Sequence, residues 1–433
     1  MTLELQHIRL SELSATEHRR IVRRSAVADP AVREAARSIC DDVRSRGDAA
    51  VTEAGVKFGG GRPTPLVPAG EMRAAWDGVS EEVREAITVA VKNVELFHSA
   101  QRPDDLTIEP VPGVRIDRRW SPLRSVGAYV PGGKAAYPSS LVMTVVPARA
   151  AGVGRIVVAS PAGPDGVMDV TLLATAHYLG VTELYAMGGA QAIAALAYGT
   201  GTIEPVEKIV GPGNAYVTAA KLLVLGQCAI DMPAGPSEVL VVADRTADPE
   251  IVAVDLLCQA EHGPDSPAVL VTDSPDLAGA VVAQLSRLLP GLERHEILAQ
   301  ALSEHGLIVG VDSIPEALAF ANEYAAEHVT VNTDNAESDA AQIRSAGSIY
   351  VGHWSPEAAG DYATGANHVL PTGGLARSMN PLGFEDFGSW RQVQTISEAG
   401  LRAIAPTIST LATAEGLTAH RLSVEVRLRN PDG

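Results

Sequence analysis

Short hydrophobic runs recur along the chain from residue 125 onward, and they alternate with Ala- and Leu-rich stretches of helical spacing. This alternation predicts repeated βα units that form parallel sheets, with Gly and Pro at nearly every junction. The central part of the chain is therefore predicted to be doubly wound α/β. Eight runs are the expected strands: 126–130, 155–159, 183–187, 239–242, 268–272, 307–311, 328–332 and 348–351.

The two ends of the chain show a different pattern. Residues 30–46 and 80–101 are charged and amphipathic, and three glycines at 59–61 separate them. We expect both stretches to be helices that pack on the outer face of a sheet. Near the C-terminus the strand pattern fades, and residues 404–414 and 419–426 have helical spacing. This tail is predicted to form an arm or cap outside the α/β body.

Length and charge narrow the classes of function. The 433 residues exceed what one compact core usually holds, so two α/β units are expected. The chain has 34 basic and 52 acidic residues, a formal net charge of -18, and no block of like charges concentrates it. A broad interaction with nucleic-acid phosphates or anionic lipid is therefore disfavoured, and small-molecule chemistry is expected.

The cysteines and the apolar runs indicate a cellular location. Cys40, Cys228 and Cys258 show no paired spacing. This argues against a disulfide framework or a cysteine-only zinc site, and it suits a reducing compartment, the cytoplasm. Charged residues interrupt the apolar stretch at the start of the chain, and no apolar run approaches the length of a membrane span. We expect neither a signal peptide nor a transmembrane helix.

Glycine-rich loops follow three of the predicted strands, at 129–133, 188–191 and 211–214. Such loops can present backbone N–H groups to a phosphate at the start of a helix. The dinucleotide fingerprint G-x-G-x-x-G is absent, since 210–214 comes closest and lacks the third glycine. Any one of these loops is better explained as a βα turn, but three together favour a ligand site.

Gln259 and His262 fall near the end of a predicted helix that Asp248 and Pro249 begin. Residues three apart project from one helix face, so both side chains could bind one metal ion. A histidine at a helix C-terminus also interacts favourably with the helix dipole. Taken alone, the pair is better explained by the dipole.

Other titratable side chains stand at junctions. Glu327 and His328 lie where a predicted helix gives way to a strand, which suits acid–base chemistry and a solvated helix end equally. Residues 360–368 form a glycine-rich loop with a carboxylate and an imidazole, and such loops tend to be functional. Glu415 and His420 flank a short link in the tail, and their interpretation depends on context.

Two longer strings, IDMPAGPSE at 230–238 and QAEHGP at 259–264, resemble those of the histidinol dehydrogenase family. Further matches run in family order between residues 125 and 420, so chance matching of isolated motifs is a poor explanation. They are 188–193, 211–214, 327–328, 355–357, 360–362, 367–371 and 418–420. The first hundred residues match only in general character.

The resemblance implies roles for the side chains named above. It implies a single zinc site whose ligands also contact the substrate: Gln259, His262, Asp361 and His420. The implied catalytic bases are Glu327 and His328. Histidinol would further be held by Ser237, His328, His368 and Glu415. The implied NAD contacts are Tyr129, Gln191 and Asn214.

The resemblance also implies an architecture and an assembly. The expected fold is α/β, with two doubly wound, incomplete Rossmann-like parallel-sheet domains and helical N- and C-terminal arms. The expected parts are an N-terminal arm, a substrate and zinc domain, an NAD domain and a C-terminal arm: 1–24, 25–124 with 238–380, 125–237, and 381–433. A homodimer is implied, in which the C-terminal arm of one subunit completes the site of the other.

The implied reaction is the last step of histidine biosynthesis, the oxidation of L-histidinol through L-histidinaldehyde to L-histidine. Going from an alcohol to a carboxylate removes four electrons, so two NAD molecules are consumed in succession. His328 would take the alcohol proton, and Glu327 would activate water to hydrate the aldehyde. Zinc would hold the imidazole and amino groups of the substrate and so orient the reacting carbon.

Three alternatives stay open at this point. Cys258 could act as a thiohemiacetal nucleophile, although helical geometry turns it about 100° away from Gln259. The protein could instead be a zinc-dependent hydrolase that needs no nicotinamide. It could also be a binding protein that holds a small ligand between two α/β domains. Formation of NADH from histidinol and NAD separates all three.

Overall fold

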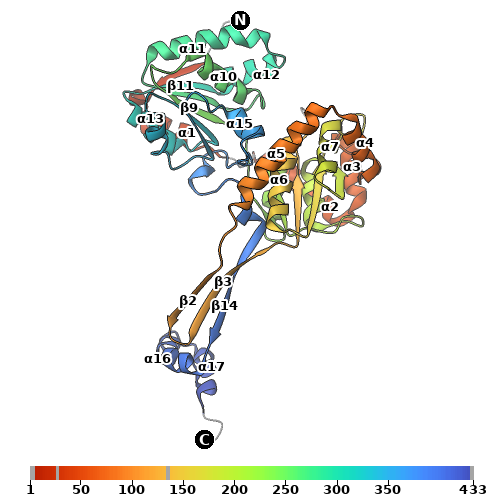
Figure 1. Cartoon of the computed structure of the whole chain (residues 1–433), viewed down its shortest axis with the longest axis vertical. Coiled ribbons are helices and arrows are strands. Elements are labelled where there is room, and N and C mark those ends of the chain that lie inside the picture. Colours follow the sequence, from red (N-terminus) through yellow and green to blue (C-terminus); the bar gives the residue numbers. More distant parts are fainter. Residues whose placement is uncertain (1–4, 26–28, 133–136, 430–433) are drawn as a thin grey trace. The chain divides into compact units, whose positions relative to one another are not determined.

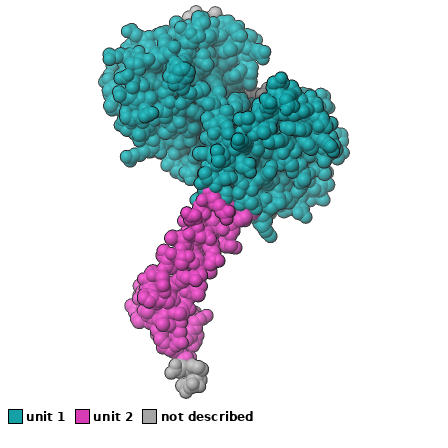
Figure 2. Space-filling model, viewed as in Figure 1, with its two compact units in different colours: residues 1–101, 124–387 teal, residues 102–123, 388–433 magenta. Residues whose placement is uncertain are grey.

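The computed structural model of the chain describes residues 5–25, 29–132 and 137–429. The chain divides into two compact units: residues 1–101 with 124–387, and residues 102–123 with 388–433 (Figure 1, Figure 2). The larger unit holds two parallel sheets, which confirms the predicted α/β class. None of the described helices is long and apolar enough to cross a membrane.

The first parallel sheet has six strands in the order β1-β11-β10-β9-β12-β13. Along β9 the side chains alternate between two buried layers, with Val239 and Val241 in one and Leu240 and Val242 in the other. Burial on both faces explains why these strands read as continuous hydrophobic runs. The strands are β1 Gln6–Arg9, β9 Val239–Ala243, β10 Ala268–Thr272, β11 Gly306–Gly310, β12 His328–Asn332 and β13 Ser348–Val351.

Helices cover both faces of the six-stranded sheet (Figure 1). One face packs against α10 Pro249–Ala260, α11 Pro275–Leu288 and α12 His295–His305. The other packs against α1 Ala15–Val22 and α13 Ile314–Tyr324. Two short helices, α14 Ala336–Ala340 and α15 Glu357–Tyr362, follow β12 and β13. The predicted start of α10 is confirmed, because the Asp248 side chain accepts a hydrogen bond from the N–H of Glu250.

The second parallel sheet has five strands in the order β6-β5-β4-β7-β8. They are β4 Ser125–Tyr129, β5 Arg155–Ser160, β6 Glu183–Ala186, β7 Lys208–Val210 and β8 Ala229–Ile230. Its connecting helices are α6 Pro138–Ala151, α7 Val170–Tyr178, α8 Gly189–Tyr198 and α9 Ala215–Val224. All eight predicted strands are confirmed, each end within one residue. Of the strands in the two parallel sheets, β1, β7 and β8 were not predicted.

The N-terminal helices pack against the connecting helices of this second sheet. They are α2 Pro30–Arg46, α3 Asp48–Phe58, α4 Ala69–Gly78 and α5 Glu81–Ser99. Helix α2 contacts α8 and α9, α4 contacts α7, and α5 contacts α6. These contacts differ from the expected grouping of 25–124 with 238–380, since Ala36 and Cys40 share a core with Val157 of β5. The amphipathic pattern showed that these helices pack, but it carries no information about which sheet they cover.

The smaller unit contains the two helices expected in the C-terminal arm, and it also contains strands that were not predicted. It contains an antiparallel sheet of order β14-β3-β2, followed by two helices. Strand β14 is exposed along most of its length, so no alternation of apolar residues marks it in the sequence. For the same reason β1 was missed in the N-terminal arm. The elements are β2 Leu106–Val111, β3 Val114–Pro122, β14 Gly388–Ile396, α16 Glu398–Ala414 and α17 Thr418–Leu428.

Candidate active site

Strands β9 and β12 are neighbours that begin side by side, because His328 pairs with Val239 in their parallel register. This register brings Ser237, just before β9, next to Glu327, just before β12. The Ser237 hydroxyl donates a hydrogen bond to Oε2 of Glu327, and the N–H of Glu238 donates to the same oxygen at 2.9 Å. Two residues that are 90 positions apart in the chain therefore meet at the amino ends of the two strands.

Burial shifts the pKa of both proposed bases, in opposite directions. Glu327 is 6% exposed and His328 is 2% exposed. Burial raises the pKa of Glu327 well above its ordinary value, although the two hydrogen bonds that its carboxylate accepts lower it. Burial, together with repulsion from His262 and His368, lowers the pKa of His328 to about 3. The imidazole of His328 is therefore neutral near pH 7.

Helices α10 and α15 bring further polar side chains to the same place. Gln259, in the last turn of α10, places its Oε1 atom 3.3 Å from Nδ1 of His328. His262 follows the end of α10, and α15 supplies Glu357 and Asp361, which are one helical turn apart. One ligand atom each of His262, Glu357 and Asp361 lies within 4.8 Å of the others. Gln259 and Glu357 both lie beside His328, and Glu357 in turn lies near His262 and Asp361.

Several polar atoms of this cluster are buried and have no hydrogen-bond partner among the described residues. They are Nε2 of Gln259, Nε2 of His328, and both carboxyl oxygens of Glu357. Buried polar groups in native proteins are nearly always paired, so an exception calls for a ligand or ion. Imidazole nitrogen, amide oxygen and carboxylate oxygen are donors that zinc accepts. The residues present therefore fit a zinc ion together with a polar small ligand.

His368 belongs to the same cluster. Its Nδ1 atom lies 3.2 Å from the backbone oxygen of Asp361, and its Nε2 atom lies 3.2 Å from Oγ of Ser140 in the first turn of α6. Burial lowers the pKa of His368 to about 4. A neutral imidazole in this position connects α6 with the loop after α15, beside the other proposed substrate contacts.

The loops proposed for NAD follow the carboxyl ends of β4, β6 and β7. Tyr129 ends β4, and its hydroxyl accepts a hydrogen bond from the N–H of Gly189, where α8 begins. Gln191 is buried in the first turn of α8, and Asn214 caps α9 by accepting from two backbone N–H groups. The strand order reverses between β4 and β7, and open α/β sheets bind ligands at such a point. Gly133, the last residue of the first loop, lies outside the described residues.

A buried ion pair fastens the third of these loops, and sequence reasoning missed it. The side chains of Lys221 and Asp231 are 1% and 0% exposed and contact each other. Lys221 donates to the backbone oxygen of Gly211 at 3.0 Å, and Asp231 accepts from the N–H of Gly211 at 2.7 Å. Gly211 has φ 114°, and a Cβ there would collide with the backbone oxygen of Tyr129. Only glycine fits this turn.

Glu415 and His420 belong to the smaller unit. Glu415 directly follows α16, His420 lies in the first turn of α17, and both residues are exposed. Of the four residues expected to bind zinc, Gln259, His262 and Asp361 belong to the larger unit. The fourth, His420, belongs to the smaller unit.

The environment of Cys258 argues against a thiohemiacetal route. Burial, together with the nearby carboxyl groups of Glu357 and Asp361, raises the pKa of this thiol to about 12. The thiolate is the nucleophilic form of cysteine, and it is scarce at neutral pH when the pKa is so high. We therefore interpret Cys258 as a residue of α10 that contributes to packing and not to catalysis.

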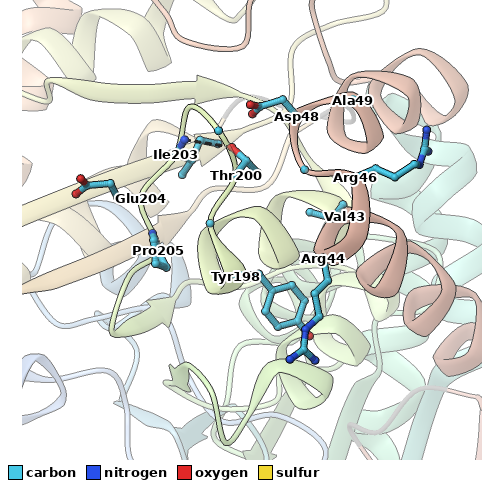
Figure 3. Close-up of a pocket in the computed structure, with 13 residues that line it drawn as sticks. Val43, Arg44, Arg46, Asp48, Ala49, Tyr198, Thr200, Ile203, Glu204 and Pro205 are labelled. Atoms are coloured by element: carbon cyan, nitrogen blue, oxygen red, sulfur yellow. Dashed lines mark hydrogen bonds between the residues drawn. The ribbon is translucent and has the colours of Figure 1, made fainter.

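The hollow drawn in Figure 3 contains none of the residues discussed above. It is lined by the end of α2, the start of α3 and the loop after α8. At this place Arg46 pairs with Asp42 and Glu53, and Asp48 accepts a hydrogen bond from Thr202. None of the described side chains that line the hollow has a buried polar atom without a partner, in contrast to the cluster at the ends of β9 and β12.

Comparison with known proteins identifies the family. The family model for histidinol dehydrogenase matches residues 22–428. The chain belongs to the histidinol dehydrogenase family. A histidinol dehydrogenase of Vibrio parahaemolyticus is 45% identical over 421 residues, which cover 96% of each chain. That of Methanothermobacter thermautotrophicus is 47% identical over 389 residues, covering 90% of this chain and 91% of its own.

A solved structure supports the same assignment for the fold. The crystal structure of histidinol dehydrogenase from Elizabethkingia anophelis matches with a TM-score of 0.92 and 38% identity. The match covers 98% of both chains. The resemblance read from the sequence strings is therefore confirmed, and the chain is an oxidoreductase of the histidinol dehydrogenase family.

Glu357 is the main residue of the cluster that sequence reasoning missed. It appeared only inside the string at 355–357 and was not assigned a role. Glu357 and Asp361 are four residues apart, so both carboxyl groups lie on one face of α15. This spacing is the signal in the sequence from which a role for Glu357 beside Asp361 could have been predicted. The structure shows Glu357 to be 1% exposed and beside His328.

Proposed function

We propose that the chain catalyses the zinc-dependent, NAD-linked oxidation of L-histidinol through L-histidinaldehyde to L-histidine. The observation that carries the proposal is the buried cluster at the amino ends of β9 and β12. Three side chains there have unpartnered polar atoms: Gln259, His328 and Glu357. Membership of the histidinol dehydrogenase family supplies the substrate, and the cluster supplies donors suited to a polar amino alcohol.

Gln259, His262 and Asp361 would hold the zinc ion, together with His420. When bound, the ion supplies a fixed positive charge that orients the nitrogen groups of the substrate and thereby the reacting carbon. The chain contributes the mixed nitrogen and oxygen donors, and burial of Gln259 and Asp361 limits competition from water. Ser237 and His368 border the same cluster and are suited to hold the rest of the substrate.

His328 is suited to take the proton of the alcohol. Burial lowers the pKa of its imidazole to about 3, so the ring is neutral, and its Nε2 atom has no partner among the described residues. As the hydroxyl proton moves to this nitrogen, a hydride leaves the carbon that bears the hydroxyl group and passes to NAD. The product of this step is the aldehyde, which stays bound.

Glu327 is suited to activate water for the second oxidation. Its carboxyl group is held by the hydroxyl of Ser237 and the N–H of Glu238. Burial raises the pKa of Glu327, which makes the carboxylate a stronger base toward water. His328 first releases the alcohol proton to solvent. The hydrated aldehyde then loses a hydroxyl proton to His328 and a second hydride to NAD, and the carboxylic acid so formed ionises to the carboxylate.

The test is NADH formation from histidinol and NAD, followed by the absorbance of NADH. The wild-type protein is expected to form two NADH per histidinol. Glu327→Gln keeps the shape but lacks the base, so it is expected to form one NADH per site and then stall. Glu337→Gln, the same change at an exposed glutamate of α14, is the control and should behave like the wild type. Equal loss of alcohol and aldehyde oxidation in Glu327→Gln rejects this division of labour.

We also propose that the chain acts as a homodimer in which Glu415 and His420 complete the site of the partner. Inactive Gln259→Ala and inactive His420→Ala proteins, unfolded and refolded together, would then form mixed dimers with one wholly intact site. Recovered activity supports the crossed arm. Verified mixed dimers without activity exclude it, because every site would then carry one lesion.

The proposed location is the cytoplasm. All three cysteines are free: Cys40, Cys228 and Cys258. Free thiols persist in a reducing compartment, where disulfides are rare. Histidinol and NAD are the proposed small-molecule partners, and the acidic net charge gives no reason to expect nucleic acid.

A further inference from the structure

Glu357 is a buried carboxyl group that the proposed mechanism does not use. It is 1% exposed, and neither of its oxygens has a hydrogen-bond partner among the described residues. Burying an unpaired carboxyl group is costly, so packing alone does not explain why the site contains one. Its position therefore points to an interaction that forms in the working enzyme.

Glu357 faces the ring of His328. Its Oε1 atom lies 3.6 Å from Nδ1 of His328, slightly longer than a hydrogen bond. Two other side-chain oxygens lie near the same nitrogen: Oε1 of Gln259 at 3.3 Å and Oε2 of Glu327 at 3.8 Å. Three acceptors therefore compete for one N–H group, and which of them receives it decides how the imidazole is held.

Two of these acceptors have other tasks. Oε2 of Glu327 already accepts hydrogen bonds from Ser237 and from the N–H of Glu238. Gln259 can bind a metal ion only through Oε1, because an amide nitrogen has no available lone pair. When Gln259 serves as a zinc ligand, Glu357 is the acceptor left for Nδ1 of His328.

We propose that Glu357 is a positioning residue, which accepts the Nδ1–H of His328 in the zinc-loaded enzyme and so leaves the lone pair of the imidazole on Nε2. A neutral imidazole carries one N–H, and the acceptor opposite that N–H fixes both the tautomer and the ring orientation. Nε2 is the buried nitrogen without a partner, and it is the atom that must take the substrate proton. This inference rests on the proposed function.

A direct metal-ligand role is the competing explanation for Glu357. One of its oxygens lies within 4.8 Å of ligand atoms of His262 and Asp361, and its Oε1 atom is 3.9 Å from Nε2 of His262. The two roles make different predictions. A positioning residue can be replaced without loss of zinc, whereas removal of a ligand lowers the zinc content.

The experiment compares Glu357→Gln with Glu357→Met. The glutamine keeps a carbonyl oxygen that can accept the Nδ1–H, and methionine has similar volume without an acceptor. We expect Glu357→Met to retain zinc and a near-normal KM for histidinol but to lose kcat by about 10²- to 10⁴-fold in both oxidations, since His328 acts in both. Glu357→Gln should recover most of that loss. Glu337→Met, at an exposed position, is the matched control and should be unaffected.

A second readout does not depend on turnover. In protein labelled with ¹⁵N-histidine and loaded with zinc, His328 should show a protonated Nδ1 and an unprotonated Nε2, with its signals assigned by their loss in His328→Gln. The tautomer should become mixed in Glu357→Met and be restored in Glu357→Gln. This spectrum reports the contact even if the wild-type protein fails to oxidise histidinol, in which case the proposed function fails separately.

Several outcomes overturn the proposal. Loss of zinc from both Glu357 variants would show a ligand role instead. A normal kcat in Glu357→Met would show that the carboxyl group does not act on His328. Protonation of Nε2 in the zinc-loaded wild type would reverse the proposed tautomer, and that measurement stands even if Glu357→Met does not fold.

Discussion

Two buried polar clusters in the larger unit differ in one respect. Behind the Gly211 turn, Lys221 and Asp231 contact each other and also hold both backbone polar groups of Gly211. At the amino ends of β9 and β12, the side chains of Gln259, His328 and Glu357 have polar atoms with no partner among the described residues. The first cluster is completed by folding, whereas the second is left incomplete by folding.

This difference distinguishes side chains that stabilise the fold from side chains whose polar atoms gain a partner only when a ligand binds. A satisfied buried pair is strongly destabilised when one partner is removed, because the other charge stays buried. An unsatisfied group lowers stability in the folded state, so its removal costs little stability and much function. Four predictions test this contrast, and they are ordered by the size of the expected effect.

The largest effect is expected at the zinc ligands. Gln259→Ala and His262→Ala should each lower the zinc content and reduce activity by more than about 100-fold, while the fold stays intact, because the cores lie elsewhere. Metal analysis, NADH formation and circular dichroism measure the three quantities. Full activity in a verified metal-free protein would contradict this prediction, and so would the loss of the fold in both variants.

The next effect is expected at the satisfied pair. Lys221→Met leaves the carboxylate of Asp231 buried and uncompensated, so the free energy of unfolding should fall by about 3–5 kcal/mol. Urea denaturation measures this loss. In the double variant Lys221→Met with Asp231→Asn, the amide can still accept from the N–H of Gly211, so part of the stability should return. A loss below about 1 kcal/mol in the single variant would show that the pair is not fully buried in solution.

A third prediction concerns Asp255 of α10, a buried carboxyl group whose partner is the side chain of Asn332. Burial raises the pKa of Asp255 from 3.8 to about 7. Between pH 3.8 and pH 7 the carboxyl group is therefore protonated in the folded state but ionised in the unfolded state. The stability that this proton contributes is complete below pH 3.8 and is lost as the pH rises through 7. Asp255→Asn should therefore be more stable than the wild type at pH 8, by about 2–4 kcal/mol.

The measurement for Asp255 is urea denaturation of both proteins at pH 5 and at pH 8. The advantage of Asp255→Asn should be larger at pH 8, since the wild-type carboxyl group is ionised there in both states. An advantage that does not change with pH would mean that Asp255 titrates normally in the folded protein.

The smallest effect is expected for Cys258→Ala. The thiol has a pKa of about 12, so the nucleophile needed for a thiohemiacetal is lacking near neutral pH. Turnover should be retained, and the free energy of unfolding should fall by about 1 kcal/mol or less from lost packing. Total inactivation with normal zinc content and normal stability would instead support the thiohemiacetal route.

The sequence by itself determined the elements that are buried on both faces. Strands such as β9 and β10 are continuous hydrophobic runs, because helices cover both sides of their sheet, and their limits were predicted closely. Local spacing also placed Gln259 and His262 together at the end of α10. Strand β14 was not predicted, because its side chains are mostly exposed and its sequence shows no alternation of apolar and polar residues. Burial leaves a pattern in the sequence, and exposed pairing between strands leaves none.

Only the tertiary structure decided which distant groups meet. Ser237 touches Glu327 because β9 and β12 are adjacent in the sheet, although β10 and β11 lie between them in the chain. The same adjacency sets His328 beside Glu357, whose missing partners cannot be read from composition or spacing. Whether a buried side chain is satisfied depends on atoms contributed by other elements, so the sequence could name the reactive residues but could not show which of them folding leaves without a partner.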